Sequence, residues 1–198
     1  GYRQLLQVHD FAEDFRPQNY AHLMTALGGD SSGSLAQQLY PQAAGIHYAT
    51  LNHRDEAIFH NAGIDAEHLH VLVNPVAEPS NIPDQETARN RVAKELGLKP
   101  GGQLFVYPVR GIRRKNVGEM LLLAALDPRP ATYAVTLAPL NPVEAASFTR
   151  WHALAGELGL PCEFDIGAVG GLALEHAAAG ADWLMTTSVV DGLGRVLL

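Results

Sequence analysis

The sequence has 198 residues, of which 47% are hydrophobic, and a net charge of −7, a balance that suits one or two soluble globular domains. The negative charge argues against nucleic acid as a partner, no apolar run is long enough to span a membrane, and peripheral membrane contact is not indicated. Cys162 is the single cysteine, which excludes an internal disulfide framework and is typical of a cytoplasmic protein.

Short β-rich runs alternate with helical patterns along the chain. The strand candidates are mostly unbroken apolar runs, which are typical of strands buried on both faces of a parallel sheet. They cover residues 5–9, 46–51, 69–73, 103–109, 133–137, 162–166 and 183–187. The alternation predicts an α/β fold with Rossmann-like parallel sheets and helices on both faces.

Three helices have recognisable ends. One is stopped by Gly97, and a second begins after Asn116, which we expect to cap it together with Glu119. In the third, Asn141 is the expected N-cap and Glu144 its capping-box partner. The apolar face of this third helix is predicted to consist of Phe148, Trp151, Leu154 and Leu158.

A polar, proline-containing segment at 74–83 is the expected domain boundary. We expect residues 1–76 to be part of one Rossmann-like domain and residues 77–198 to be a truncated Rossmann-like domain of the nucleotide-binding type. Because both ends of the chain fall in apolar, strand-like runs, we expect it to be an internal fragment of a longer protein.

A basic loop, 107–116, joins a predicted strand to a predicted helix. Ligands of α/β sheets bind at the carboxyl ends of the strands, and helix N-termini favour anions. Arg110 can hold phosphate oxygens with two donors and Lys115 adds a point charge, so we predict that this pair binds a phosphate. Arg113 and Arg114 are expected to be solvated; the alternative is that the whole loop is a solvated basic surface.

Two further segments place polar groups at the ends of predicted strands. In 186–194, hydroxyl residues precede Asp191 and a Gly-x-Gly sequence; glycines let backbone N–H groups approach a ligand, and a carboxylate can accept from sugar hydroxyls. An ordinary turn with Asp191 as a helix N-cap explains the pattern equally well. His9 ends the first strand, where it either touches a ligand or packs as a structural residue.

The other histidines and the candidate nucleophiles give weaker signals. The pairs His53/His60 and His68/His70 lack a carboxylate or cysteine at ligand spacing, so we predict no metal site. Cys162 and Ser188 have no obvious base beside them, and neither is expected to act as a nucleophile.

Taken in order, three motifs resemble the C-terminal half of a retaining GT-B glycosyltransferase. They are Asn74-Pro75-Val76, the stretch from Arg110 to Lys115-Asn116, and Ser188-Val189-Val190-Asp191-Gly192-Leu193-Gly194. The similar family, the glycosyltransferase family 4-like or glycosyl transferases group 1 proteins, has an Arg and a Lys after the first strand of the donor domain and a later Ser-x-x-Glu-Gly-x-Gly. The resemblance spans roughly residues 69–198, and more weakly the strand end at 8–10.

The resemblance implies a role for each matching residue. Arg110 and Lys115 would hold the diphosphate of a nucleotide-sugar donor, and Asp191 would contact the hydroxyls of the sugar. The donor would also be bound by Ser188, Gly192, Leu193 and Gly194, while His9 would line the cleft from the N-terminal, acceptor-side domain. Asp191 departs from the family pattern because it is one methylene shorter than the usual Glu, and the second family Glu would fall directly after Leu198.

The implied function is metal-independent transfer of a sugar, with retention, from a nucleoside-diphosphate sugar to a carbohydrate, lipid or small-molecule acceptor. No cofactor is expected. The fragment alone is expected to be inactive, because catalysis would need both closed domains. The alternatives are a GT-B sugar-nucleotide epimerase or phosphorylase, and a non-catalytic α/β binding module in which Asp191 marks a lost site.

Overall fold

The computed structural model describes residues 3–9, 11, 17–26, 28, 39–75, 80–168 and 171–189. The chain divides into two compact units, Gly1–Val76 and Ala77–Leu198. Within the described residues, no helix is both long and apolar enough to cross a membrane. The acceptor-side and donor-binding roles expected of the two parts stay predictions.

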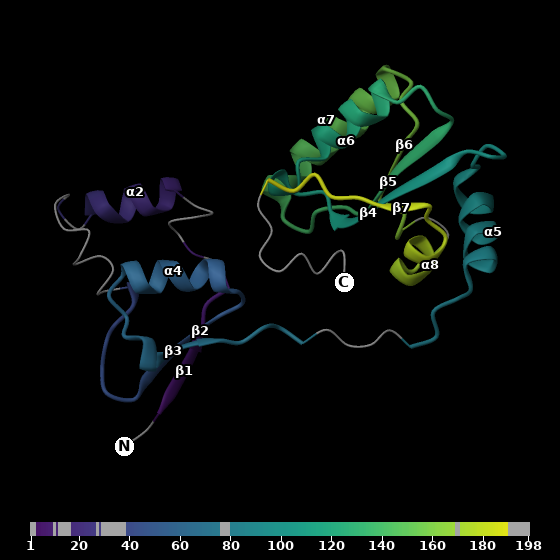
Figure 1. Cartoon of the computed structure of the whole chain (residues 1–198). Coiled ribbons are helices and arrows are strands. Elements are labelled where there is room, and N and C mark those ends of the chain that lie inside the picture. The colour runs from purple at the N-terminus through teal and green to yellow at the C-terminus, as the bar shows by residue number, and fades with distance from the viewer. Residues whose placement is uncertain are drawn as a thin grey trace. The chain divides into compact units, whose positions relative to one another are not determined.

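The first unit is built on a three-stranded parallel sheet in the order β1-β2-β3. The helix α4 lies over one face of this sheet (Figure 1), and Phe59 on α4 packs with Tyr48 and Leu69 in an apolar core. The elements are β1 (Gln4–Gln7), α2 (Pro17–Ala26), β2 (Ile46–Thr50), α4 (His53–Asn61), the 3₁₀ turn η1 (Ala66–His68) and β3 (Leu69–Val71).

The second unit is a four-stranded parallel sheet in the order β6-β5-β4-β7, with α6 and α7 on one face and α5 and α8 on the other (Figure 1). This arrangement confirms the predicted α/β class. The elements are α5 (Gln85–Leu96), β4 (Gln103–Arg110), the 3₁₀ turn η2 (Arg113–Lys115), α6 (Val117–Leu126), β5 (Ala131–Leu137), α7 (Pro142–Glu157), β6 (Cys162–Phe164), α8 (Leu174–Ala179) and β7 (Trp183–Leu184).

The central strand β4 is buried on both faces. Tyr107 and Val109 pack toward α6 and α7, whereas Leu104 and Val106 belong to the core on the α5 and α8 side. Successive side chains of a strand point to opposite faces, so a strand covered on both sides needs an unbroken apolar run. This is why the run at 103–109 predicts β4 almost to the residue.

Several strands end earlier than predicted. β6 stops at Phe164 rather than at 166, because Asp165 takes a left-handed backbone (φ 56°) and its carboxylate accepts from the backbone N–H of Ala138 at 2.9 Å. β7 covers only Trp183–Leu184. Beyond β7, the hydroxyl groups of Thr187 and Ser188 bond to Lys115 and Tyr107 and take no part in strand pairing. The apolar pattern of a strand does not predict such bonds.

Helix ends follow the sequence signals in part. Gly97 ends α5 with φ 63°, and the Asn141 side chain caps α7 by accepting from the N–H of Val143. Asn116 is the N-cap residue of α6 and donates to the Glu119 carboxylate at 2.7 Å, but with its left-handed backbone its side chain makes no capping bond to the helix. The capping-box prediction for Glu144 is wrong, because its carboxylate accepts instead from the N–H of Arg113 at 2.9 Å.

The predicted apolar face of α7 holds for all but its last residue. Phe148 is buried, and Trp151 and Leu154 pack against the same core. Leu158 is 60% exposed, because α7 ends at Glu157 and Leu158 already forms its C-cap.

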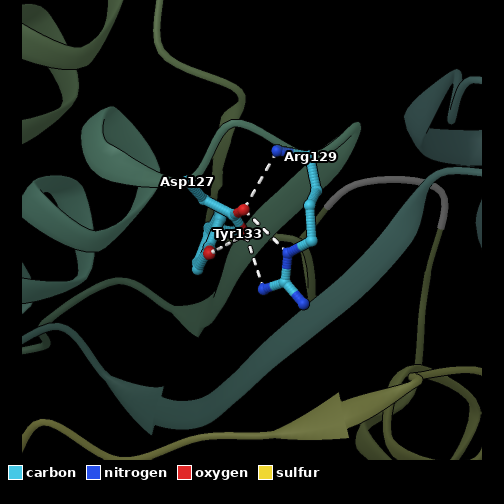
Figure 2. A network of polar contacts seen from close by, with 3 residues as sticks. All are labelled: Asp127, Arg129 and Tyr133. Atoms are coloured by element: carbon cyan, nitrogen blue, oxygen red, sulfur yellow. Dashed lines mark hydrogen bonds and ion pairs between the residues drawn. The ribbon is translucent and has the colours of Figure 1, made fainter.

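A polar network ties the end of α6 to β5 (Figure 2). The Asp127 carboxylate accepts from Nε and Nη2 of Arg129 at 2.8 and 2.9 Å and from the hydroxyl of Tyr133 at 2.8 Å. The bonds from Arg129 hold the pKa of Asp127 well below its usual range. Burial, helped by the Asp127 carboxylate, raises the pKa of Tyr133 to about 12. The network therefore fixes the α6–β5 connection with Asp127 ionised.

We expect Asp127→Asn to lower the Tm of the protein by several degrees at pH 7, because a neutral amide cannot accept the paired guanidinium bonds as a carboxylate does. The folded-state pKa of Asp127 lies below its ordinary value of 3.8. Its stabilisation is therefore present above about pH 4 and lost as the pH falls through the folded pKa. Thermal unfolding should show the difference from wild type at pH 7 shrinking toward pH 3; equal Tm values at pH 7 would contradict the assignment.

Candidate functional site

The strand order of the second unit marks one place in its sheet as a ligand site. From β4 the chain adds β5 and β6 on one side, then returns to place β7 on the other side of β4. In open α/β sheets, ligands bind outside the carboxyl ends of the strands where the order reverses. That place is between the carboxyl ends of β4 and β7, and Arg110, Lys115 and Ser188 all follow these two ends.

Arg110 stands at the carboxyl end of β4, just after an irregularity in the strand. Tyr107 pairs with Val135 but Arg110 pairs with Leu137, so one extra residue is accommodated between them. This interval contains Pro108, which has no N–H to give to the ladder. The Arg110 side chain is exposed. Its Nη1 makes a long contact of 3.4 Å to the carbonyl of Ala138, which leaves most of its donors for a ligand.

Lys115 differs from the other cations of its loop. It is 7% exposed, whereas Arg113 and Arg114 are exposed, as predicted for the solvated part of the loop. A lysine is rarely buried without polar partners, because an unpaired ammonium group is costly to remove from water. The view of the whole loop as a solvated basic surface therefore fails for Lys115.

The hydroxyl of Tyr107 connects the two segments that flank the switch point. It is fully buried and donates to the carbonyl of Lys115 at 2.9 Å. It also lies 2.6 Å from Oγ of Ser188; since a phenol has one proton, Ser188 is the donor in that bond. Sequence reasoning missed Tyr107 as a positioning residue, although a buried tyrosine in an apolar strand signals that its hydroxyl has a partner.

Thr187 and Val189 complete the tie between the segments. Oγ1 of Thr187 contacts the carbonyls of Lys115 and Asn116 at 3.1 and 3.0 Å. The N–H of Val189 donates to the carbonyl of Arg114 at 3.0 Å. These bonds hold residues 186–189 against the basic loop, so the structure brings the segment of Ser188 beside that of Lys115.

Of the remaining predicted site residues, one belongs to the first unit and four lie outside the described part of the chain. Asp191, Gly192, Leu193 and Gly194 lie outside the described residues. His9 is exposed and follows β1 at the carboxyl edge of the sheet in the first unit. The roles expected of all five stay predictions.

Two glycines bring α7 against the basic loop and the start of α6. A Cβ on Gly111 would lie 2.3 Å from the ring of Phe148, and one on Gly118 would lie 2.7 Å from the ring of Trp151. The bond from the N–H of Arg113 to Glu144, which also lies on α7, fixes the same contact. The position of the loop therefore depends on small residues facing the aromatic side of α7.

The two candidate nucleophiles are not activated. Burial raises the pKa of the Cys162 thiol to about 12, and a thiol in that state is a poor nucleophile. The Ser188 hydroxyl is used by Tyr107 and accepts from Oγ1 of Thr186 at 3.2 Å. The described part of the site thus offers cations and hydroxyl groups, which suit anion binding better than covalent catalysis.

A cavity of about 400 Å³ lies at the opposite, amino edge of the same sheet. Lys99, Gln103, Arg129 and Glu163 contribute to its lining. Arg129 is held by Asp127, and no strand of a parallel sheet directs its carboxyl end toward this edge. We therefore do not take this cavity as the main ligand site.

Comparison with known proteins supports the fold. No family model matches the sequence. The chain is 32% identical over 129 residues to the mannosylglucosyl-3-phosphoglycerate synthase of Petrotoga mobilis (strain DSM 10674 / SJ95), a match that covers 62% of this chain and 24% of that enzyme. The chain thus spans about a quarter of the length of this curated relative.

Solved structures with low sequence identity share the fold. HepE (Alr3699) of Anabaena has been solved with UDP and glucose, and with UDP-glucose. Both structures have a TM-score of 0.63 and 18% identity, and the matches cover 98% and 96% of this chain and 49% and 48% of theirs. A glycosyltransferase from Rickettsia africae ESF-5 matches with a TM-score of 0.61 and 14% identity, over 94% of this chain and 52% of its own. These likenesses agree with the predicted GT-B-like fold.

We expect Tyr107→Phe to lower the free energy of unfolding by about 1 kcal/mol, the usual worth of a buried hydrogen bond. The variant should also raise the rate of amide hydrogen exchange in 186–189, because the Ser188 tie is lost. Tyr48→Phe is the matched control: it removes a hydroxyl that donates to the carbonyl of Pro41 at 2.9 Å in the first unit and should leave exchange in 186–189 unchanged. Unaltered exchange in Tyr107→Phe would contradict the positioning role.

Gly111→Ala should cost about 1–3 kcal/mol of folding stability, since the new methyl group overlaps the Phe148 ring and overpacks the core. Gly156→Ala is the control, because a Cβ there has open space within α7; it should stabilise by about 0.5–1 kcal/mol. Chemical denaturation of both variants measures the two changes, and a neutral Gly111→Ala would show that α7 does not fix the loop.

Proposed function

We propose that this chain is part of a glycosyltransferase that uses a nucleoside-diphosphate sugar, and that the switch point of the second unit binds the diphosphate. The observation that carries the proposal is the junction of the Arg110–Lys115 loop with residues 186–189 at the ends of β4 and β7. The switch point is where a nucleotide is expected, and two cations of an otherwise acidic chain follow β4 there.

The cations match the charge that the reaction creates. Breaking the bond between a sugar and a diphosphate leaves negative charge on the departing phosphate oxygen. Arg110 and Lys115 would stabilise this charge more in the transition state than in the ground state. The buried Lys115 and its bonded loop favour a preorganised site, in which little reorganisation accompanies the reaction.

The proposed reaction proceeds with retention and without a metal ion. The acceptor oxygen forms the new bond to the sugar on the face from which the diphosphate leaves, and the leaving phosphate takes the acceptor's proton. No enzymic nucleophile is then needed, which fits the raised pKa of Cys162 and the engaged hydroxyl of Ser188. In this scheme Asp191 and the backbone of 192–194 bind the sugar, and His9 contributes from the first unit.

The similar proteins suggest substrates to test first. HepE has been solved with UDP-glucose, and the Petrotoga enzyme is named for a product that carries a glycosylated 3-phosphoglycerate. We propose a UDP-, GDP- or ADP-linked hexose as donor and a small glycoside, with a phosphorylated one tested first, as acceptor. A thermal-shift screen against these three donor classes would identify the base.

In the full-length protein, Arg110→Ala and Lys115→Ala are each expected to raise the barrier to transfer by about 2–4 kcal/mol, as removal of an oxyanion donor does. Arg114→Ala is the matched control, because Arg114 is an exposed cation of the same loop and its removal should change kcat/KM less than threefold. Initial rates of sugar transfer, measured with and without EDTA, provide the readout, and EDTA is expected to have no effect.

The same assay separates the alternatives. Consumption of the nucleotide sugar without any acceptor would indicate an epimerase, and donor binding without turnover would indicate a binding module. The anomeric configuration of the product, read by NMR, tests retention. Near-normal turnover of both Arg110→Ala and Lys115→Ala would overturn the diphosphate site.

A further inference from the structure

Three histidines gather on one face of the sheet in the first unit. Tyr48 pairs with Leu69 and Ala49 with His70 in the parallel register. This register places His47 level with His68. Tyr48 and Leu69 face the core under α4, so the strand alternation puts His47 and His70 on the opposite face. His70 is exposed, whereas His47 and His68 are half-buried.

The imidazole rings are close enough to share a ligand. Nδ1 of His47 lies 3.0 Å from Nε2 of His70, and the ring centroids of His47 and His68 are 5.0 Å apart.

Carboxylates lie beside the third histidine. Ligand atoms of Asp65, Glu67 and His68 all lie within 4.8 Å of one another in and beside the η1 turn. This group includes neither His47 nor His70, so it is separate from the pair of imidazoles on β2 and β3.

We propose that His47 and His70 form a two-imidazole site for one divalent transition-metal ion of the class that imidazole favours, such as Zn²⁺, Ni²⁺ or Co²⁺, with water completing its coordination. A nitrogen–nitrogen distance of 3.0 Å and metal–nitrogen bonds of about 2.0–2.1 Å give an angle at the metal of roughly 95°. This angle suits octahedral coordination, and tetrahedral coordination needs the two rings to separate by only about 0.4 Å.

The site is independent of the proposed transfer reaction. Its ligands all belong to the first unit, whereas Arg110, Lys115 and Ser188 belong to the second. Sugar transfer as proposed above uses no metal ion, so a bound ion would serve stability or assembly of the first unit. Binding can therefore be measured without any sugar substrate, and its failure would leave the proposed function untouched.

The test is titration of the purified, metal-free full-length protein with Co²⁺ at pH 7.5, followed by its visible d–d absorption, and with Zn²⁺ by calorimetry. We expect one ion to bind and Zn²⁺ to displace Co²⁺. His47→Ala and His70→Ala should each weaken binding at least tenfold, as expected when one ligand is lost. His47→Gln and His70→Gln repeat the test with side chains of similar length, and circular dichroism verifies that each variant is folded.

His60→Ala is the matched control, because His60 is an exposed histidine of α4. The affinity of this variant for Co²⁺ and Zn²⁺ should stay within twofold of that of the wild-type protein. Binding that is absent, or that is equally strong in wild type, His47→Gln and His70→Gln, would overturn the site.

Discussion

The buried hydroxyl of Tyr107 is the contact on which the ligand edge of the second unit depends. Tyr107 lies within the central strand β4, and its hydroxyl bonds both to the loop before α6 and to the segment after β7. Burying the phenol hydroxyl without hydrogen-bond partners would cost folding free energy. Formation of β4 therefore favours the approach of the Lys115 loop and the Ser188 segment to this hydroxyl. The hydroxyl of Thr187 bonds to the carbonyl of Lys115, and that of Thr186 bonds to Ser188. These bonds also hold residues 186–188 in place at the switch point.

Packing from α7 adds a second constraint on the same loop. Phe148 fills the space over Gly111, and Trp151 fills the space over Gly118. The apolar side of α7 thus limits how closely the loop can approach. The bond from the N–H of Arg113 to Glu144 also holds the loop against α7. The basic loop is thus held both by hydrogen bonds to Tyr107 and Thr187 and by the aromatic side chains of α7. Two independent kinds of interaction that fix one loop position favour a preorganised anion site.

The sequence predicts the sheet far better than the site. Buried parallel strands need unbroken apolar runs, so β4 is visible in the sequence. The tie between Tyr107 and Ser188 joins residues 81 positions apart, and no local pattern encodes it. The same holds for the histidine cluster, since His47 and His70 meet only through the register of β2 and β3. The capping box at Glu144 failed because a tertiary bond from the N–H of Arg113 takes its carboxylate, whereas the Asn116 side chain bonds to Glu119, three residues on, and leaves the helix backbone uncapped.

The basic loop shows why burial says more about function than the number of charges. Arg113, Arg114 and Lys115 are consecutive, yet only the last is buried. An exposed cation interacts weakly with an anion, because water and salt screen it. A buried cation attracts an anion in a medium of lower dielectric constant, where the interaction is stronger than at an exposed position. For this reason Lys115 is a better candidate for diphosphate binding than Arg113 and Arg114, whereas the exposed Arg110 is a candidate because of its place at the carboxyl end of β4.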